Sequence, residues 1–389
     1  MNHLAIIKFD EISLKGKNQP LFINQLVNNL DRRLKNNGDF LIVRRRLFLE
    51  VEYSKKESWK EIKQTLSQTF GIAKFYKAFK FSKNIDTVKP FLLSFLEGKS
   101  IESFRIKTKR SDKSFPKTSW EIDRILGEVV HSHLKIPIIL KNPELTIYVE
   151  ITTNEILVHF QEFSGLGGLP TGISGRVLAL ISGGIDSPVA AWQIMKRGCS
   201  ITFLHFHSYP LTNNSSIEKV REIVGLLQSF HGKSKLILVP FSEIQKCIIT
   251  NAPTAYRILL YRRYMFKIAQ KIALKEKALA LLTGESLGQV SSQTIQNITA
   301  ISAGTKLPIL RPLIGYNQPE IISIAKSIGT FNTSIEPDQD CCSLFVPKRP
   351  VLFAKTTEVS ELEKKLPIKN IFKNTLANIE SLVISKEKR

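Results

Sequence analysis

The fold of the C-terminal half is decided by one segment, Val177-Leu178-Ala179-Leu180-Ile181-Ser182-Gly183-Gly184-Ile185-Asp186-Ser187-Pro188. Its first five residues are apolar, as expected of a parallel strand that is buried on both faces of a sheet. A glycine turn follows, and then a helix that we expect to end at Gly198. Further apolar runs at 201–206, 236–240 and 278–282 predict more strands. The sequence therefore predicts an α/β domain with a parallel sheet.

The turn between this strand and this helix has the chemistry of a phosphate site. Gly183 and Gly184 let the backbone approach an anion closely, and the free N–H groups at the helix start face that anion. Ser182 and Ser187 add hydroxyl donors. Asp186 would repel a bare phosphate, so its presence favours Mg²⁺ as a bridge to the phosphate oxygens. In open α/β sheets ligands bind beyond the carboxyl ends of the strands, which is where this turn lies.

A bare Ser-Gly-Gly would also fit a tight turn capped by Asp or Ser. The whole string from Ser182 to Pro188, however, resembles the PP-loop of ATP pyrophosphatases. These enzymes split ATP between its α and β phosphates and usually leave an adenylated substrate. A Walker A loop is excluded, because Leu227 replaces the first glycine that the ending Gly232-Lys233-Ser234 would need.

The N-terminal half predicts smaller α+β units. Strands are expected at 4–9, 40–53, 104–110, 144–150 and 155–160, and helices at 22–35, 58–70 and 120–134, whereas 74–81 is basic and aromatic. A basic strip lies between Phe104 and Phe115, where aromatic rings are available to stack on bases. The candidate RNA-binding residues are Lys15, Arg105, Lys107, Lys109, Arg110 and Lys113. A solvated basic strand explains any one of them equally well.

Composition sets the broad class of the protein. The 389 residues are 43% hydrophobic and 23% charged, an ordinary globular mixture, and domains of about 100–200 residues would divide them into two or three. The formal charge of +22 favours polyanionic partners. An apolar run of about 18 residues is absent, so we expect no membrane span, and we find no signal-peptide pattern. Four cysteines without a CxxC pattern argue against a disulfide scaffold or a zinc ribbon and favour a reducing cytoplasm.

Further stretches carry a more specific resemblance. They are Phe9-Asp10-Glu11-Ile12-Ser13-Leu14-Lys15-Gly16, Tyr261-Arg262-Arg263-Tyr264-Met265, 284–294, 307–313 and Asp340-Cys341-Cys342-Ser343. Together with the PP-loop, and over nearly the whole chain, they resemble the ThiI-type tRNA 4-thiouridine synthetases, a family of tRNA sulfurtransferases. The resemblance implies a ferredoxin-like domain at 1–58, an RNA-binding THUMP domain at 59–162, a linker at 163–171 and a PP-loop pyrophosphatase domain at 172–389.

The resemblance also implies a reaction. ATP and Mg²⁺ would serve to adenylate uridine 8 of tRNA, and persulfide sulfur would replace its O4 to give 4-thiouridine. Together with the phosphate loop, the implied nucleotide contacts are Leu180, Ile181, Ser182, Gly183, Gly184, Asp186, Ser187, His205, Phe206, Arg262, Gly284 and Gln293. Taken alone, His205 would more often be a partly buried structural histidine.

One cysteine carries the sulfur in this family, and here it would be Cys341 or Cys342. We favour Cys342 as the catalytic thiol, with Cys341 as a resolving thiol or a small buried residue. Cys199 and Cys247 lie in apolar contexts and are expected to be inert.

Some members of the family carry a C-terminal rhodanese domain with a second reactive cysteine. Only 47 residues follow Cys342 (389 minus 342), so we expect a short form without that domain. Sulfur would then arrive from a separate cysteine desulfurase. A ThiS-like sulfur-carrier protein of thiamine synthesis and a second copy of the chain, in a homodimer, are further candidate partners.

Other functions stay open on the sequence alone. Another PP-loop enzyme, such as an amide-forming synthetase or a different tRNA thiolase, would lack the N-terminal RNA-binding domains. A non-catalytic THUMP-type RNA-binding protein would not need the intact loop at 182–187. A THUMP methyltransferase is disfavoured, because the sequence contains no Asn-Pro-Pro-Tyr motif.

Overall fold

The computed structural model describes residues 3–9, 11–35, 39–55, 58–337 and 349–384. The chain forms two compact units, Met1–Gly167 and Gly168–Arg389. The division between them falls inside the glycine-rich stretch that the sequence suggests as a linker. None of the helices in the described part is long and apolar enough to cross a membrane.

In its described residues, the N-terminal unit is built on one eight-stranded sheet. The strand order is β2-β3-β1-β4-β7-β6-β5, and β8 pairs with β4 beside this path. Every pairing is antiparallel except that of β5 with β6. The strands are β1 (His3–Lys8), β2 (Phe40–Arg44), β3 (Leu49–Tyr53), β4 (Lys74–Ser82), β5 (Phe104–Arg110), β6 (Leu145–Ile151), β7 (Glu155–His159) and β8 (Phe163–Ser164).

Two pairs of helices cover this sheet and enclose separate apolar cores. The first pair is α1 (Gln19–Leu34) and α2 (Trp59–Ser67), and the second is α3 (Val88–Leu96) and α4 (Ser119–Leu134). Leu26 and Leu30 of α1 are buried against Ile7, whereas Leu126 of α4 is buried against Phe104. Each helix therefore buries one apolar stripe, which is the main source of its stability.

Helix α2 packs in the core of the first part of the chain. Ile62 and Leu66 of α2 are buried in the same core as α1, although the expected boundary at 58/59 would assign α2 to the second part. Strand β4 serves both cores, since Phe75 packs into the first and Phe81 against the second. The packing thus favours a division near β4.

The opposite face of this sheet carries buried charges that connect the two parts. Glu150 of β6 accepts a hydrogen bond from Lys8 Nζ of β1 at 2.7 Å and another from the Tyr76 hydroxyl. Burial alone would raise the pKa of Glu150, but Lys8 and Tyr76 hold this pKa below its usual value. Similarly, Glu50 of β3 is 2.9 Å from Lys80 Nζ of β4. These bonds fix the register of strands that are distant in sequence.

His159 at the end of β7 lies between two tyrosine rings on this face. Its ring centroid is 3.7 Å from that of Tyr76 and 4.7 Å from that of Tyr148. Burial lowers the pKa of His159 to about 4, although Glu150 and Glu162 oppose this change. His159 is therefore neutral at pH 7, and its contact with Glu162 is not an ion pair at that pH.

The C-terminal unit is an α/β domain, as the sequence predicts. Its described strands form a six-stranded sheet in the order β13-β12-β9-β10-β11-β14, parallel except for β14. They are β9 (Arg176–Leu180), β10 (Ser200–His207), β11 (Ser234–Pro240), β12 (Ala280–Leu282), β13 (Ile309–Leu310) and β14 (Glu380–Ile384). Successive strands run outward from β9 to β11, and β12 then returns to the other side of β9. The switch point of the topology is therefore between β9 and β12.

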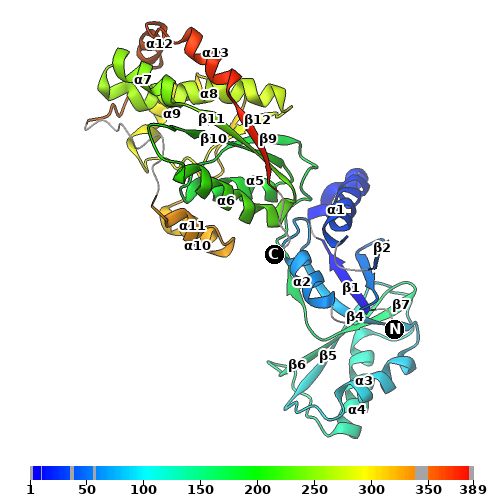
Figure 1. Ribbon diagram of the computed structural model, residues 1–389. Coiled ribbons are helices and arrows are strands. Elements are labelled where there is room, and N and C mark those ends of the chain that lie inside the picture. Colours follow the sequence, from blue (N-terminus) through cyan, green and yellow to red (C-terminus); the bar gives the residue numbers. More distant parts are fainter. Residues whose placement is uncertain (1–2, 10, 36–38, 56–57, 338–348, 385–389) are drawn as a thin grey trace. The chain divides into compact units, whose positions relative to one another are not determined.

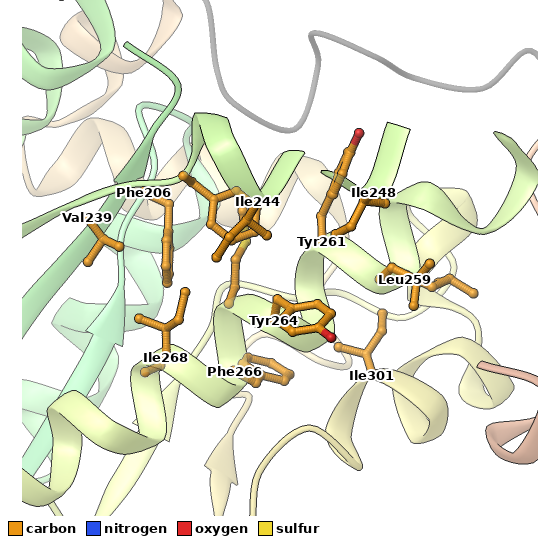
Figure 2. Close-up of a cluster of buried hydrophobic side chains, with 14 of the residues drawn as sticks. Phe206, Val239, Ile244, Ile248, Leu259, Tyr261, Tyr264, Phe266, Ile268 and Ile301 are labelled. Carbon is orange, nitrogen blue, oxygen red and sulfur yellow. The ribbon is translucent and has the colours of Figure 1, made fainter. Parts of the chain in front are cut away.

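Helices cover both faces of this sheet (Figure 1). Helices α5 (Asp186–Lys196) and α6 (Ser215–His231) lie on one face, and α7 (Ser242–Asn251), α8 (Arg257–Lys275) and α9 (Ile295–Ser302) lie on the other. Figure 2 shows the second layer, where Phe206 and Val239 of the strands lie beside Ile244 of α7 and Ile268 of α8. The structure also contains elements that the sequence does not predict, namely β4, β8, β13, β14, α3, α6, α7, α9, α10 (Gln318–Ser327), α11 (Phe331–Ile335), α12 (Thr356–Lys364) and α13 (Lys369–Ala377).

Candidate functional site

The glycine turn lies at the switch point, at the carboxyl edge of the parallel sheet. Strand β9 ends at Leu180 and α5 begins at Asp186. The Ser182 N–H donates to Ser187 Oγ at 3.0 Å, and the two serine hydroxyl oxygens are 3.2 Å apart. These bonds stabilise the turn. The first N–H groups of α5 have no partner within the helix, so they are available at the turn. An anion placed there would meet a preformed set of donors.

Gly284, which follows β12, packs directly against this turn. A Cβ atom added to Gly284 would lie 2.7 Å from the backbone nitrogen of Ser187 and 2.8 Å from the carbonyl carbon of Asp186. Both neighbours are backbone atoms, which cannot move aside as the end of a side chain can. Position 284 therefore requires glycine if β12 is to approach the first turn of α5 this closely.

A cavity of about 320 Å³ opens at this place. Its volume is at the lower end of the range of about 300–1,000 Å³ that ligand pockets have. It brings together all the predicted nucleotide-binding residues except Gly183, from segments up to 113 residues apart (293 minus 180). They are Leu180, Ile181, Ser182, Gly184, Asp186, Ser187, His205, Phe206, Arg262, Gly284 and Gln293.

Two arginines and one glutamate set the charge beside this cavity. The Glu285 carboxylate is 1% exposed and lies 2.5 Å from Arg262 Nη2 and 2.5 Å from Arg311 Nε. Burial alone would raise the pKa of Glu285, but the two guanidinium groups hold this pKa below its usual value. The Arg262–Glu285–Arg311 triad thus has one positive charge in excess. Neither Glu285 nor Arg311 is a predicted site residue, although both stand in stretches that carry the family resemblance.

Asp186 is held by two amides at the start of α5. Gln289 Nε2 donates to its Oδ2 at 3.1 Å, and Gln318 Nε2 of α10 donates to its Oδ1 at 3.4 Å. Burial raises the pKa of Asp186, while these two hydrogen bonds oppose the rise. The amides are neutral, so the carboxylate keeps its negative charge for a cation. A carboxylate beside a phosphate loop is the arrangement that Mg²⁺ prefers, so the residues fit this ion.

His205 and Gln293 contribute to the cavity in different ways. The His205 ring is 1% exposed, with its Nδ1 3.0 Å from the Ile181 carbonyl oxygen and its Nε2 3.4 Å from Ser216 Oγ. This histidine therefore connects β10 to the turn after β9 and is largely structural. Gln293 is also buried, yet its Oε1 has no hydrogen-bond partner among the described residues. That oxygen is available to a donor on a ligand.

The candidate RNA-binding residues of β5 divide into two kinds. Arg105 Nη1 donates to the Leu140 carbonyl oxygen at 2.9 Å. Arg110 Nη1 donates to the carbonyl oxygens of Phe115 and Lys117 at 3.1 and 2.9 Å. The two arginines therefore hold neighbouring loops in place. The side chains that remain exposed on this strip are Lys107, Lys109 and Lys113, whereas Lys15 is half-buried and lies over the ring of Phe22.

The structure describes two of the four cysteines. Cys341 and Cys342 lie outside the described residues. Cys199 and Cys247 are buried, and burial raises the pKa of both thiols. A buried thiol with a raised pKa is a poor nucleophile, which agrees with the inert role that the sequence suggests for both.

Comparisons with known proteins find relatives over the whole chain. Family models match at 4–76 (ThiI ferredoxin-like domain), 83–160 (THUMP domain) and 172–368 (Thiamine biosynthesis protein, ThiI). The chain is 44% identical over 386 residues to a "Probable tRNA sulfurtransferase" of Thermus thermophilus, which covers 97% of this chain and 93% of the relative. A protein of the same name from Moorella thermoacetica is 38% identical and covers 98% of each chain.

Solved structures agree with these matches. A 4-thiouridine synthetase, crystallised as an RNA complex with bound ATP, superposes with a TM-score of 0.89 at 32% identity, covering 99% of this chain and 100% of the other. PH1313 of Pyrococcus horikoshii has the same fold at 22% identity, with a TM-score of 0.64 over 85% of this chain and 100% of its own. By sequence and by fold, this chain belongs to the ThiI family of tRNA sulfurtransferases.

Proposed function

We propose that this chain uses ATP to adenylate uridine 8 of a tRNA and then replaces the uridine O4 with sulfur, giving 4-thiouridine. The observation that carries the proposal is the cavity at the switch point, which the phosphate loop lines together with Arg262 and Glu285. The N–H groups of the turn at the start of α5 and the Arg262 guanidinium are donors of the kind that bind a triphosphate. The solved relative that contains RNA and bound ATP is itself a 4-thiouridine synthetase.

The residues of the cavity suggest how ATP would lie in it. The phosphates would accept hydrogen bonds from the turn at 182–187 and from Arg262. Leu180, Ile181 and Phe206 offer apolar surface for the adenine ring. The buried Gln293 Oε1 would accept a hydrogen bond from the adenine amino group, which would satisfy this otherwise unpaired oxygen.

We place Mg²⁺ beside Asp186, because this residue lines the cavity at the end of the phosphate loop and its carboxylate accepts hydrogen bonds from neutral amides. When bound, the ion would neutralise charge on the phosphate oxygens as pyrophosphate leaves. Asp186 itself would orient the ion, and Gln289 and Gln318 would orient Asp186.

The proposed chemistry has two stages. In the first, the uridine O4 attacks the α-phosphorus of ATP, pyrophosphate leaves, and AMP becomes attached to the base oxygen. In the second, the terminal sulfur of a persulfide on Cys342 attacks C4 and AMP leaves, so that C4 is joined to Cys342 through two sulfurs. A second thiolate, for which Cys341 is the candidate, attacks the Cys342 sulfur and releases the thiocarbonyl. An external thiol then reduces the disulfide that forms.

Residues 351–354 are fixed close to the cavity. Asn297 binds Val351 and Ala354, with Nδ2 donating to the Val351 oxygen at 2.8 Å and Oδ1 accepting from the Ala354 nitrogen at 3.0 Å. Thr294, which adjoins Gln293 of the cavity wall, donates to the Leu352 oxygen at 2.6 Å. Val351 is nine residues after Cys342 (351 minus 342), a length that reaches about 30 Å when extended. This anchorage supports a role for Cys342 at the cavity.

The test is to incubate the protein with unmodified tRNA, ATP, Mg²⁺, a cysteine desulfurase and cysteine, and to measure pyrophosphate release and 4-thiouridine at position 8. Cys342→Ser should release pyrophosphate but form no 4-thiouridine, because only the second stage needs the thiol. Asp186→Asn should lose both activities. Cys199→Ala, a buried cysteine, is the matched control and should keep both. Full thiolation by Cys342→Ser would overturn the proposed sulfur step.

The finer partners belong to the same proposal. A cysteine desulfurase would load the persulfide, and a ThiS-like carrier would be a second acceptor, since the family description names thiamine biosynthesis. Transfer of sulfur-35 from the desulfurase to each acceptor tests both. Because tRNA and ATP are the substrates, we place the enzyme in the cytoplasm. A homodimer remains a prediction that light scattering would check.

A further inference from the structure

We propose that Glu285 is a positioning residue, which fixes the guanidinium of Arg262 in the single orientation that the reacting phosphates need, while Arg311 anchors Glu285. This inference rests on the ATP site proposed above and goes beyond it, because Glu285 would act through Arg262.

The geometry of the Arg262–Glu285–Arg311 triad supports this role. Arg262 is fixed at two points on the cavity wall, with Nη2 2.5 Å from Glu285 Oε1 and Nη1 donating to Ser292 Oγ at 3.1 Å. A guanidinium is a planar group with five N–H donors. The hydrogen bond to Ser292 and the ion pair with Glu285 engage its two terminal nitrogens, so together they restrict how the group can rotate.

Glu285 is fixed in turn from its other side. Its Oε2 accepts from Arg311 Nε at 2.5 Å and from Thr283 Oγ1 at 2.9 Å. Arg311 is itself held by a bond from Nη2 to Ser302 Oγ of α9 at 2.8 Å. The orientation of Arg262 is thereby connected through Glu285 to β12, β13 and α9.

The charge balance favours positioning over binding strength as the function of Glu285. A carboxylate beside Arg262 weakens the attraction of the cavity for a polyanion, and burying it has a desolvation cost. An apolar residue at 285 would leave Arg262 more attractive to phosphate but free to change rotamer. What the carboxylate adds is a fixed direction, which matters when the transition state must be met within a fraction of an ångström.

The next residue of α8 provides a matched comparison. Arg263 is also paired with a buried glutamate, Glu363 of α12, at 3.1 Å, and Glu363 is 2.5 Å from Lys267 Nζ. This second triad has the same composition of one carboxylate and two cations, but its members do not line the cavity. It joins α8 to α12 and should be purely structural.

The experiment compares Glu285→Gln, Arg311→Lys and Glu363→Gln with the wild type. It measures the Kd for ATP by titration calorimetry and the rate of pyrophosphate release at saturating ATP with unmodified tRNA. We expect Glu285→Gln to bind ATP as tightly as the wild type or more tightly, and to release pyrophosphate about tenfold more slowly or worse. Arg311→Lys should also keep its affinity for ATP and release pyrophosphate more slowly, with a smaller loss of rate than Glu285→Gln. Glu363→Gln should lower Tm and leave the rate unchanged.

A wild-type rate in Glu285→Gln would overturn the inference. So would equal losses of ATP affinity and rate, because a merely structural role would reduce both together. If Glu285→Gln does not fold, Arg311→Lys alone decides between the same outcomes. A wild-type protein that binds no ATP, or releases no pyrophosphate with tRNA, would refute the proposed function instead, so the two failures are distinguishable.

Discussion

Replacing Gly284 with alanine should displace the phosphate loop and weaken the binding of ATP. The added methyl group would lie 2.7 Å from the Ser187 nitrogen and 2.8 Å from the Asp186 carbonyl carbon. An ordinary contact between carbon atoms is about 3.5 Å, so the loop or β12 would have to retreat by roughly 0.7 Å. Both sides are backbone, and neither can relieve the clash by changing a rotamer.

The size of this effect follows from the displacement. Overpacking of a well-packed interior usually costs about 1–3 kcal/mol, which for a unit of this size is a loss of several degrees in Tm. A misplacement on the order of 1 Å at a reacting centre can cost about a hundredfold in rate. We therefore expect Gly284→Ala to raise the Kd for ATP by about 10- to 100-fold and to slow pyrophosphate release further.

The assay is titration calorimetry with ATP and Mg²⁺, together with a thermal melt of each variant. Gly225→Ala is the control, because Gly225 lies inside α6 and an added Cβ there meets nothing within 4 Å. This control should bind ATP normally and gain about 0.5–1 kcal/mol in stability from the better helix residue. An unchanged Kd in Gly284→Ala would refute the close-approach argument.

Three further predictions follow from the described contacts. Because burial gives His159 a pKa of about 4 when folded against 6.5 otherwise, the unfolded chain binds this proton more tightly, and stability should fall by up to about 3 kcal/mol as pH drops from 6.5 to 4. The free energy of unfolding, measured with urea at pH 7 and pH 4.5, should differ less between the two pH values in His159→Phe than in the wild type. An equal difference would exclude His159 as the cause. The double variant Lys107→Gln/Lys109→Gln should lower the salt slope of RNA affinity by about 1–2, whereas Lys89→Gln on α3, which is paired with Asp86 at 2.6 Å, should not change it. Asp186→Asn should abolish the tightening of ATP binding by Mg²⁺, and an undiminished Mg²⁺ effect in calorimetry would place the ion elsewhere.

The basic strip illustrates how sequence reasoning can group unlike residues. In the sequence, one run of positive charge contains Arg105, Lys107, Lys109 and Arg110. From the sequence alone, each of them is an equally good candidate for binding RNA. The structure separates them, because the Arg105 guanidinium donates to Leu140, 35 residues away, and Arg110 is bound to two loop carbonyls. The sequence shows where positive charges occur, but it does not show which of these side chains are hydrogen-bonded within the folded protein.

The sequence by itself determined the strand, the glycine turn and the helix from Val177 to Lys196, which is the place where we propose that phosphate binds. All the information for this unit is local, since an apolar run, two glycines and a helix stop lie within a few turns of each other. The same holds for the strands β1, β10 and β11, which are largely apolar, and for β5, in which apolar and basic residues alternate. Long, regular patterns of apolar residues can therefore be recognised directly in the sequence.

Only the tertiary structure decided which side chains meet at the site. Arg262 and Arg263 are neighbours in sequence, yet one lies on the cavity wall beside Glu285 and the other is buried against Glu363. Successive residues of a helix point about 100° apart, so their roles depend on which face α8 turns toward the sheet. The position of Glu285 is likewise set by β12 returning to the far side of β9. Such pairings join residues that are distant in sequence, and they exist only after the strands have taken their order.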